Sequence, residues 1–276
     1  MAARIAVAAV NFGDTFPGHM YRLIARQLRP DQRIVECATQ STAATEATRG
    51  RLLKLLEGEP RPIAFIGIGV RPDPRALAAY RDAGVPVILV DEEAEGATTV
   101  ASDNVLGGWL AGAHLAGQGR RHIAIVVGKL NADGDMNAAL RLEGFEKALS
   151  EEGISPVEVI YSIDYSRKDG VTAMRRLLAG RRKMDGVFAA AGDVCATGML
   201  AVARERGVRV PDDVAVVGFD DLGIAAAAEP PLTTIRQPAE EIAAQAFRLA
   251  TEETAEILAR PRRVILRPEL VVRASA

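Results

Sequence analysis

The sequence has few of the features that mark disulfide-rich, membrane-spanning or nucleic-acid-coating proteins. Its two cysteines, Cys37 and Cys195, lie far apart without CxxC spacing, so neither a disulfide framework nor a structural zinc site is indicated. The 34 Lys and Arg residues are balanced by 36 Asp and Glu residues, which leaves no excess of positive charge to neutralise phosphates. No apolar run approaches the ~20 residues that a membrane helix needs, and the short apolar N-terminus is not preceded by a cationic segment. The sequence therefore predicts a soluble protein of a reducing compartment, the cytoplasm.

Motifs of catalysis, cofactor binding and metal binding are also lacking. There is no GxxxxGK[ST], HExxH or GxSxG motif. The segment Gly67–Gly69 has two glycines of a dinucleotide fingerprint, but Pro72 stands at the third position, which favours a tight turn after a strand. Asn131–Asp135 resembles the start of a calcium loop, yet its glycine is misplaced and Leu142 stands where the bidentate acid belongs. We therefore expect no metal, no cofactor and no enzyme activity.

Short apolar runs alternate with longer amphipathic stretches along the chain. The runs are rich in β-branched residues and have the length of strands that are buried on both faces, as in a parallel sheet covered by helices. The predicted strands are 4–10, 33–37, 63–68, 85–90, 122–127, 157–161, 186–190 and 214–218. The predicted helices are 43–56, 75–81, 104–115, 140–151, 170–178, 193–206 and 239–259. This alternation predicts an α/β protein with doubly wound sheets, which bind ligands beyond the carboxyl ends of their strands.

The pattern breaks at three places, which indicates two Rossmann-like lobes joined by crossing strands. A length of 276 residues suggests about two units at ~150 residues per domain. The strand ending at Val90 is followed by an acidic loop and then by the extended segment 98–102, with no helix between them. The proline-bounded stretch 230–238 and the segment 260–263 would be two further crossings. The predicted lobes are 1–101 with 237–260, and 102–236 with 261–276, and they would enclose a cleft with hinge motion.

Seven segments, in this order, resemble the effector-binding domain of the lactose-repressor/galactose-repressor (LacI/GalR) family of transcriptional regulators. They are Pro86–Asp91, Ser102–Gly108, Gly119–Gly128, Arg141–Phe145, Arg209–Asp221, Pro231–Gln237 and Leu266–Ser275. The similarity runs from Arg4 to the C-terminus. The resemblance implies the fold of periplasmic binding proteins of type I, a small sugar-like effector in the cleft, and lobe closure that controls binding to operator DNA.

The family resemblance also implies a DNA-binding helix-turn-helix headpiece of roughly 60 residues before the first strand. The sequence starts at that strand, so we expect either a chain trimmed of its headpiece or a natural stand-alone relative. Paired headpieces imply a homodimer, for which the apolar helix 105–115 offers a candidate face. Two alternatives stay open: a periplasmic sugar-binding protein of a transporter, and an enzyme with Asp91 and Asp220 as a carboxyl pair.

Three charged residues are the leading candidates for ligand binding. Arg141 falls where the family's motif has its ligand-binding arginine, and its planar fork suits vicinal oxygens; the alternative is a surface salt bridge. Asp220 follows a predicted strand and matches the family's ligand-binding acid, with a turn or helix cap as the alternative. Asp91 corresponds to a second acid of the cleft, with hinge hydrogen bonding as its rival role.

Aromatic and further polar residues complete the predicted site. Phe16, in the first loop, and Tyr165, after the strand 157–161, occur where relatives place aromatic walls, although either ring could instead pack within a lobe. The remaining candidates are polar side chains at loop positions, where Asp193 has the alternative role of capping the helix that follows it. They are Asn11, Asp14, Asn137 and Asp193.

The sequence departs from the family pattern at two places that bear on the ligand. Many relatives have Asn-Asp where this chain has Gly192-Asp193, so one amide that could bind a hydroxyl is lost. The first loop, Asn11–Pro17, lacks the usual Asn-Pro-Phe-Phe string. A hexose or pentose is therefore not the only expectation, and a purine, a sugar acid or another small polar metabolite remains an alternative.

Overall fold

The computed structural model describes residues 2–39, 45–128, 136–180, 183–252 and 254–276. The chain forms two compact units, 1–102 with 238–266 and 103–237 with 267–276. The sequence placed residues 261–266 with the second lobe. They belong to the first unit because β11 (Arg263–Leu266) pairs in parallel with β5 (Thr98–Ser102). The other two crossings lie within one residue of the expected positions.

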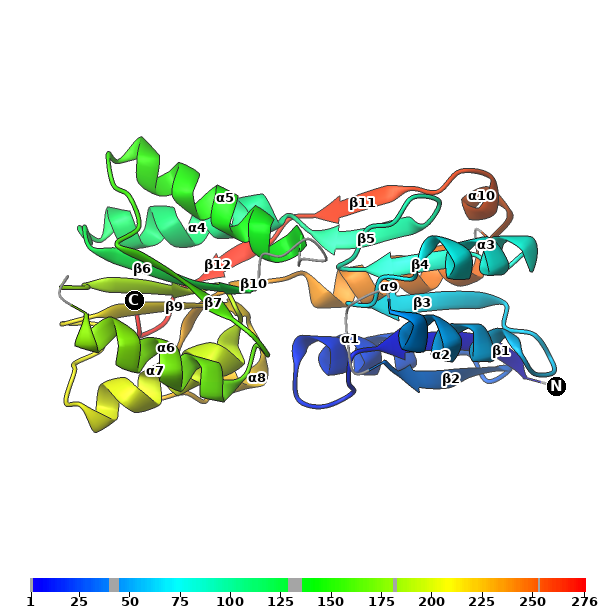
Figure 1. Ribbon diagram of the computed structural model, residues 1–276, viewed down its shortest axis with the longest axis horizontal. Coiled ribbons are helices and arrows are strands. Elements are labelled where there is room, and N and C mark those ends of the chain that lie inside the picture. The colour runs from blue at the N-terminus through cyan, green and yellow to red at the C-terminus, as the bar shows by residue number, and fades with distance from the viewer. Residues whose placement is uncertain (1, 40–44, 129–135, 181–182, 253) are drawn as a thin grey trace. The chain divides into compact units, whose positions relative to one another are not determined.

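The first unit is built around a sheet of parallel strands in the order β11-β5-β4-β3-β1-β2 (Figure 1). Its other strands are β1 (Ala3–Ala9), β2 (Gln32–Ala38), β3 (Ala64–Ile68) and β4 (Val87–Val90). Its helices are α1 (Phe16–Ala25), α2 (Glu46–Leu56), α3 (Pro74–Asp82), α9 (Ala239–Thr251) and α10 (Thr254–Ala259). The predicted single helix 239–259 is thus two helices, and α1 was not predicted.

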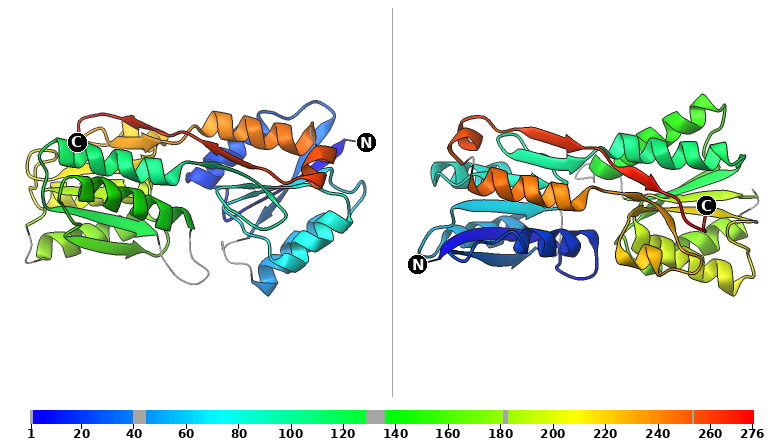
Figure 2. Two further views of the ribbon diagram at one scale, coloured as in Figure 1. Left: turned by 90° about the horizontal axis from the view of Figure 1, so that it is seen from above. Right: turned by 180° about the vertical axis from the view of Figure 1, so that it is seen from behind.

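Helices cover both faces of the first sheet because its strands are apolar on both sides (Figure 2). Along β1, Ile5, Val7 and Ala9 join the core cluster that contains α1 and α9. The intervening Ala6 and Ala8 join a second cluster that contains residues of α2 and α3. Successive side chains of a strand point to opposite faces, so a continuous apolar run produces a sheet buried on both sides.

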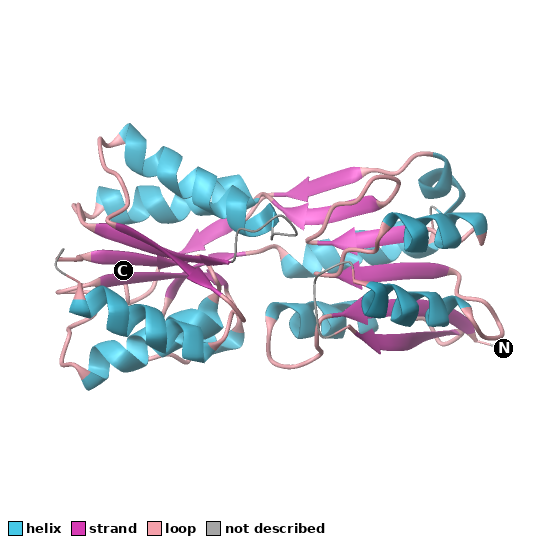
Figure 3. Cartoon of the chain, in the orientation of Figure 1, coloured by secondary structure: helices cyan, strands magenta, loops and turns pink. Residues whose placement is uncertain are grey.

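The second unit has the same plan, with the sheet order β12-β10-β9-β8-β6-β7, and helices cover both faces of its sheet (Figure 3). Only its β12 edge is antiparallel, through the pairing with β10. Its strands are β6 (Ile123–Gly128), β7 (Glu158–Ser162), β8 (Gly186–Ala189), β9 (Ala215–Asp220), β10 (Thr233–Arg236) and β12 (Glu269–Val271). Its helices are α4 (Asn104–Gly117), α5 (Met136–Glu151), α6 (Arg167–Ala179), α7 (Asp193–Glu205) and the short α8 (Gly223–Ala226).

Several helices of both units begin at a side-chain cap that the sequence supplies. Asp73 accepts a hydrogen bond from Ala76 N–H at the start of α3, at 2.8 Å. Asp103 does the same for Leu106 N–H at α4, at 2.9 Å. Ser166 and Asp169 form a reciprocal capping box at α6. These caps fix where the loops at the carboxyl ends of the strands stop, and therefore where their side chains lie.

Candidate functional site

The strand order of the second unit predicts where a ligand binds. Its sheet extends from β6 in two directions, to β7 on one side and to β8 on the other. The carboxyl ends of β6 and β8 therefore flank the topological switch point, where open α/β sheets bind ligands. Polar residues from five elements gather around this point. We call Asn104, Asn137, Arg141, Tyr165, Asp220 and Gln237 the switch-point cluster.

Arg141 is the buried cation of this cluster. Its side chain lies on α5 with the residue only 8% exposed. Its Nε–H donates to Asn104 Oδ1 at 2.7 Å, and Nη1 donates to the Ala190 carbonyl at 2.9 Å, at the end of β8. The guanidinium carbon lies 3.6 Å from the centroid of the Phe219 ring. Among the described residues these hydrogen bonds use two of five guanidinium N–H groups, so a ligand can take up others.

Asp220 is the acid of the cluster and lies at the end of β9. Gln237 Nε2 donates to its Oδ1 at 2.7 Å. Burial raises the pKa of Asp220 to about 6, although the Arg141 charge and the Gln237 hydrogen bond act in the opposite direction. At neutral pH the carboxylate is thus charged and poorly hydrated, and it can accept hydrogen bonds from the hydroxyl groups of a ligand.

Two amides connect the arginine to the rest of the cluster. Asn104, at the start of α4, accepts from Arg141 and donates through Nδ2 to Asn137 Oδ1 at 3.0 Å. Asn104 and Gln237 are each 2% exposed. Neither residue was predicted as a site residue from the sequence. The available signal was their place in the segments Ser102–Gly108 and Pro231–Gln237, which carry the family resemblance.

Tyr165 lies at the carboxyl end of β6, as its position after β7 suggested. A Cβ atom on Gly128 would lie 1.7 Å from the Tyr165 hydroxyl oxygen and 3.0 Å from Ala138 Cβ on α5. Glycine at 128 is therefore required for the ring to approach the end of β6. The ring also packs partly against the core cluster that contains residues of α6 and α7, so the structure shows packing within the lobe and its contact with a ligand stays a prediction.

Asp193 is near the cluster but is fully buried. The residue is 0% exposed, and its carboxylate accepts from Thr234 Oγ1 at 2.6 Å and from Leu222 N–H at 2.8 Å. It is the first residue of α7, whose N-cap is Gly192, and it does not cap this helix with its side chain. Burial and the neighbouring Asp220 raise the pKa of Asp193 well above its ordinary value. Asp193 has no exposed surface in this structure through which to contact a ligand.

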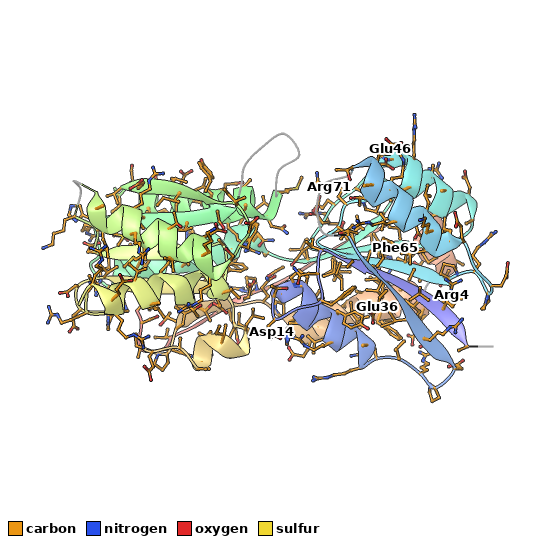
Figure 4. The ribbon with its side chains drawn as sticks, turned by 60° about the horizontal axis from the view of Figure 1, so that its bottom comes forward. Arg4, Asp14, Glu36, Glu46, Phe65 and Arg71 are labelled. Atoms are coloured by element: carbon orange, nitrogen blue, oxygen red, sulfur yellow. The ribbon has the colours of Figure 1, made fainter. Side chains whose placement is uncertain are left out.

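The candidates Asn11, Asp14 and Phe16 lie at the carboxyl edge of the first unit, and their partners belong to the first loop, to α1 and to the core of this unit. Asn11 Oδ1 accepts from Gly13 N–H at 3.1 Å and from Thr15 Oγ1 at 3.0 Å. Asp14 lies in the loop before α1, where its side chain is fully exposed and pairs with Arg22 at 3.7 Å (Figure 4). Phe16 is the first residue of α1, not a loop residue as predicted, and its ring packs partly against the core of this unit.

Asp91 follows β4 and is partly buried. Its backbone has φ 57°, and its N–H donates to the Val100 carbonyl at 3.2 Å. This left-handed conformation is uncommon for residues other than glycine and asparagine, and aspartate tolerates it. The structure thus places Asp91 at the carboxyl edge of the first sheet, as the strand pattern predicted, and its role in ligand binding stays a prediction.

The described part of the chain contains neither a metal-ligand cluster nor a helix that could span a membrane. No group of three or more His, Cys, Asp or Glu side chains there is arranged to hold a metal ion. The calcium-loop segment Asn131–Asp135 lies outside the described residues. No described helix combines the length and the hydropathy needed to cross a bilayer.

Two α/β units with this strand order and a switch-point cluster define a periplasmic-binding-protein-like domain. Residues 113–276 match the family model described as periplasmic binding protein-like domain. The chain is 30% identical to the HTH-type transcriptional regulator DegA of Bacillus subtilis (strain 168), over 98% of this chain and 80% of that protein. It is 38% identical to the HTH-type transcriptional regulator CelR of Thermobifida fusca, over 81% of this chain and 62% of that protein.

Solved structures agree with these relatives. A complex of the transcriptional regulator CelR with cellobiose has a TM-score of 0.84 and 29% identity, over 99% of this chain and 84% of that chain. A LacI transcriptional regulator from a Rhodococcus species has a TM-score of 0.82 and 28% identity, over 99% of this chain and 98% of that chain. The chain belongs to the periplasmic-binding-protein-like domains of the LacI/GalR family of transcriptional regulators. These relatives are regulators, so the transporter and enzyme alternatives are not favoured.

Proposed function

We propose that the chain senses a small polyhydroxylated effector, a sugar or a related polar metabolite, and binds it at the switch-point cluster. The observation that carries this proposal is the pairing of a stacked, buried guanidinium at Arg141 with a poorly hydrated carboxylate at Asp220. The oxygens of a vicinal diol can accept hydrogen bonds from the arginine, and its hydroxyl groups can donate hydrogen bonds to the carboxylate. The Tyr165 ring would pack against the apolar C–H face of such a ligand. The CelR–cellobiose complex supports a sugar as the first class to test.

The effector would act by changing which conformation of the regulator is populated. A ligand shifts a conformational equilibrium only by as much as its affinity differs between the two states. We propose that this shift alters the affinity of a helix-turn-helix segment for operator DNA in the bacterial cytoplasm. The names of DegA and CelR as HTH-type transcriptional regulators support this part of the proposal.

We also propose that the chain acts as a homodimer, because two helix-turn-helix segments bind two half-sites at a fixed spacing. On α4, the apolar residues Val105, Leu106 and Trp109 are only partly buried within the monomer, which makes this helix a candidate for a symmetric contact. Light scattering should give twice the 29.4 kDa of the chain. A mass of one chain at all concentrations would contradict this part of the proposal.

Isothermal titration calorimetry tests effector binding directly. The chain is titrated with cellobiose, ribose, gluconate and a set of nucleobases at pH 7. We expect saturable heat with at least one sugar or sugar acid, and no such heat with the R141A variant. Binding of a nucleobase alone would replace the sugar class with a purine-like effector. No heat with any compound, together with an unchanged unfolding temperature, would overturn the proposal.

A further inference from the structure

Gly192 has a backbone conformation and a position that only glycine allows. Its φ of 100° and ψ of 168° lie in a region that residues with a Cβ atom essentially do not occupy. A Cβ atom there would lie 2.9 Å from Asp220 Oδ2, closer than real Cβ contacts. Because glycine has no Cβ atom, Asp220 Oδ2 can lie beside the start of α7.

Asp193 connects three elements that surround Asp220. Its own backbone begins α7, Thr234 reaches it from β10, and Leu222 N–H reaches it from the turn after β9. A Cβ atom on Gly218 would lie 2.4 Å from Asp193 Oδ1, so a glycine on β9 makes room for the carboxylate. The Asp193 side chain that accepts both hydrogen bonds has no solvent exposure, so bulk water cannot readily replace these bonds if the side chain is removed.

The turn that carries Asp220 needs such ties. Asp220 and Asp221 have φ values of 104° and 57°, and neither residue is a glycine. Backbone in these regions persists only where its surroundings over-determine it. Asp221 is fixed on one side by Arg236 and Arg273, each at 2.6 Å. Asp193 fixes the other side through the Leu222 N–H.

We propose that Gly192 and Asp193 are positioning residues for Asp220: together they hold the turn after β9 in the conformation that presents the Asp220 carboxylate to the effector. The proposal rests on the proposed function, in which Asp220 binds the effector. This role would also explain why the chain has Gly192-Asp193 where many relatives have Asn-Asp. The glycine does not only remove an amide but makes the space that the Asp220 carboxylate occupies.

The charges around the pair determine which substitutions are informative. Asp220 faces the Arg141 cation, the Gln237 amide and the Asp193 carboxyl, and Asp193 also faces Asp221. Burial, followed by the Asp220 charge, raises the pKa of Asp193 well above its usual range, so the informative substitution is a neutral side chain of the same shape. A neutral asparagine at 193 then preserves both hydrogen bonds, because the Thr234 hydroxyl can accept as well as donate.

The test measures the ionisation of Asp220 by carboxyl ¹³C NMR as a function of pH, which requires no ligand. D193A and G192A are expected to lower the Asp220 midpoint from about 6 toward the ordinary value of ~3.9, because the displaced carboxylate gains water. D193N should leave the midpoint where it is. T234V removes the hydrogen bond from Thr234 to Asp193 but leaves the Asp193 side chain in place. It should lower the Asp220 midpoint by a smaller amount, and it keeps the test possible if D193A does not fold.

Asp185 provides a matched control in the same unit. Its carboxylate also accepts two backbone hydrogen bonds, from Arg121 N–H at 3.0 Å and His122 N–H at 2.9 Å. It precedes β8 and therefore lies at the amino edge of the sheet, opposite the switch-point cluster. D185A should lower the unfolding temperature without moving the Asp220 midpoint.

Affinity for cellobiose, measured by calorimetry on the same variants, is the second readout. We expect at least a tenfold loss in D193A and G192A, and less than a threefold loss in D193N. A D193N variant that loses as much as D193A would show that Asp193 contacts the effector as a carboxylate, and would overturn the positioning role. Unchanged Asp220 midpoints in D193A, G192A and T234V would also overturn it. If wild-type protein binds no compound of the panel, the proposed function fails while the NMR titration still decides the positioning role.

Discussion

The two units share one strand plan but differ in what they place at the switch point. In the first unit, β1 and β3 flank this point, and the adjacent Asn11 bonds to Gly13 and Thr15 of its own loop. In the second unit, the corresponding side chains bond across elements, as Arg141 does to the end of β8. A ligand site is effective when its groups are fixed before the ligand arrives. The same topology thus carries a preorganised charged cluster in the second unit and, in the first unit, a loop whose Asn11 side chain bonds to groups of the same loop.

Charged groups of the first unit are paired with each other near its carboxyl edge. Arg71, labelled in Figure 4, donates through Nε to Glu92 Oε2 at 3.1 Å and forms an ion pair with it, and the Glu92 side chain is largely buried. In the described part of the second unit, the hydrogen bonds of the Arg141 guanidinium go to a carbonyl and an amide, and it stacks on an aromatic ring, while Asp220 interacts with it only through its charge. The charge of Arg141 therefore remains available, and we expect the second unit to provide most of the effector affinity.

The largest effect that we predict is the loss of binding on replacing Arg141. R141A removes charge-assisted hydrogen bonds worth ~1.5–3 kcal/mol each, so affinity should fall by about 100-fold or more. The matched variant in the first unit, R71A, should change affinity by less than about threefold, because Arg71 is neutralised by Glu92. Calorimetry on both variants checks the pair. Equal losses would remove the proposed difference between the units.

The second prediction concerns Asp220, where function and stability should change in opposite directions. D220N keeps an acceptor for Gln237 but loses the charge, so affinity should fall by roughly 30-fold or more. The pKa of Asp220 is raised to about 6 in the fold, so this carboxyl stabilises the fold only while protonated, and that stability is lost as pH rises from ~4 through ~6. At pH 7, D220N should therefore be more stable by up to about 3 kcal/mol. A chemical denaturation series at pH 7 measures the change, and a destabilised D220N would contradict the assignment.

The third prediction is a pH dependence of effector binding that comes from the second unit alone. Below pH 6 the Asp220 carboxylate takes up a proton, and it can then no longer accept hydrogen bonds from two hydroxyl groups. Affinity should therefore fall by about tenfold between pH 7 and pH 5. The D220N variant should show a flat profile over the same range. A profile that is equally steep in D220N would trace the dependence to another group.

The smallest effects are predicted in the first loop of the first unit. N11A removes an acceptor that serves Gly13 and Thr15, and D14A removes a fully exposed acid. Each should change effector affinity by less than about threefold, because Asn11 bonds within its own loop and the Asp14–Arg22 pair is exposed and weak. A tenfold loss in either variant would show that this loop is ordered by the effector and contributes more than the free structure suggests.

Much of the fold was predictable because the strands are continuous apolar runs, as in β1, whose alternate residues enter two cores. Helix α1 was missed because Phe16-Pro17-Gly18 has the composition of a loop, although proline is well suited to the first helical turn. Gly18 is needed there because a Cβ atom would lie 1.9 Å from the Gly13 carbonyl oxygen. The close approach that requires this glycine is a tertiary feature with no local signal.

The candidate site was only partly predictable. Asp220 was predicted as a site residue from its position after a strand and from the family resemblance, and Arg141 from the resemblance and its place in a predicted helix. Asp193 was assigned as a ligand or a helix cap, yet its partner Thr234 lies 41 positions away in the sequence. Asn104 and Gln237 bond to cluster residues 37 and 17 positions away. Such pairings depend on the order of strands in the sheet, which local patterns of hydropathy do not specify.

The most direct test of the switch-point cluster is NMR of two labelled groups, Arg141 Nε–H and Asp220 Cγ, during titration with the sugar that binds best. The account predicts that both signals move together and saturate with the calorimetric affinity. Saturable binding that leaves both signals unmoved would contradict it, because the effector would then bind elsewhere on the molecule.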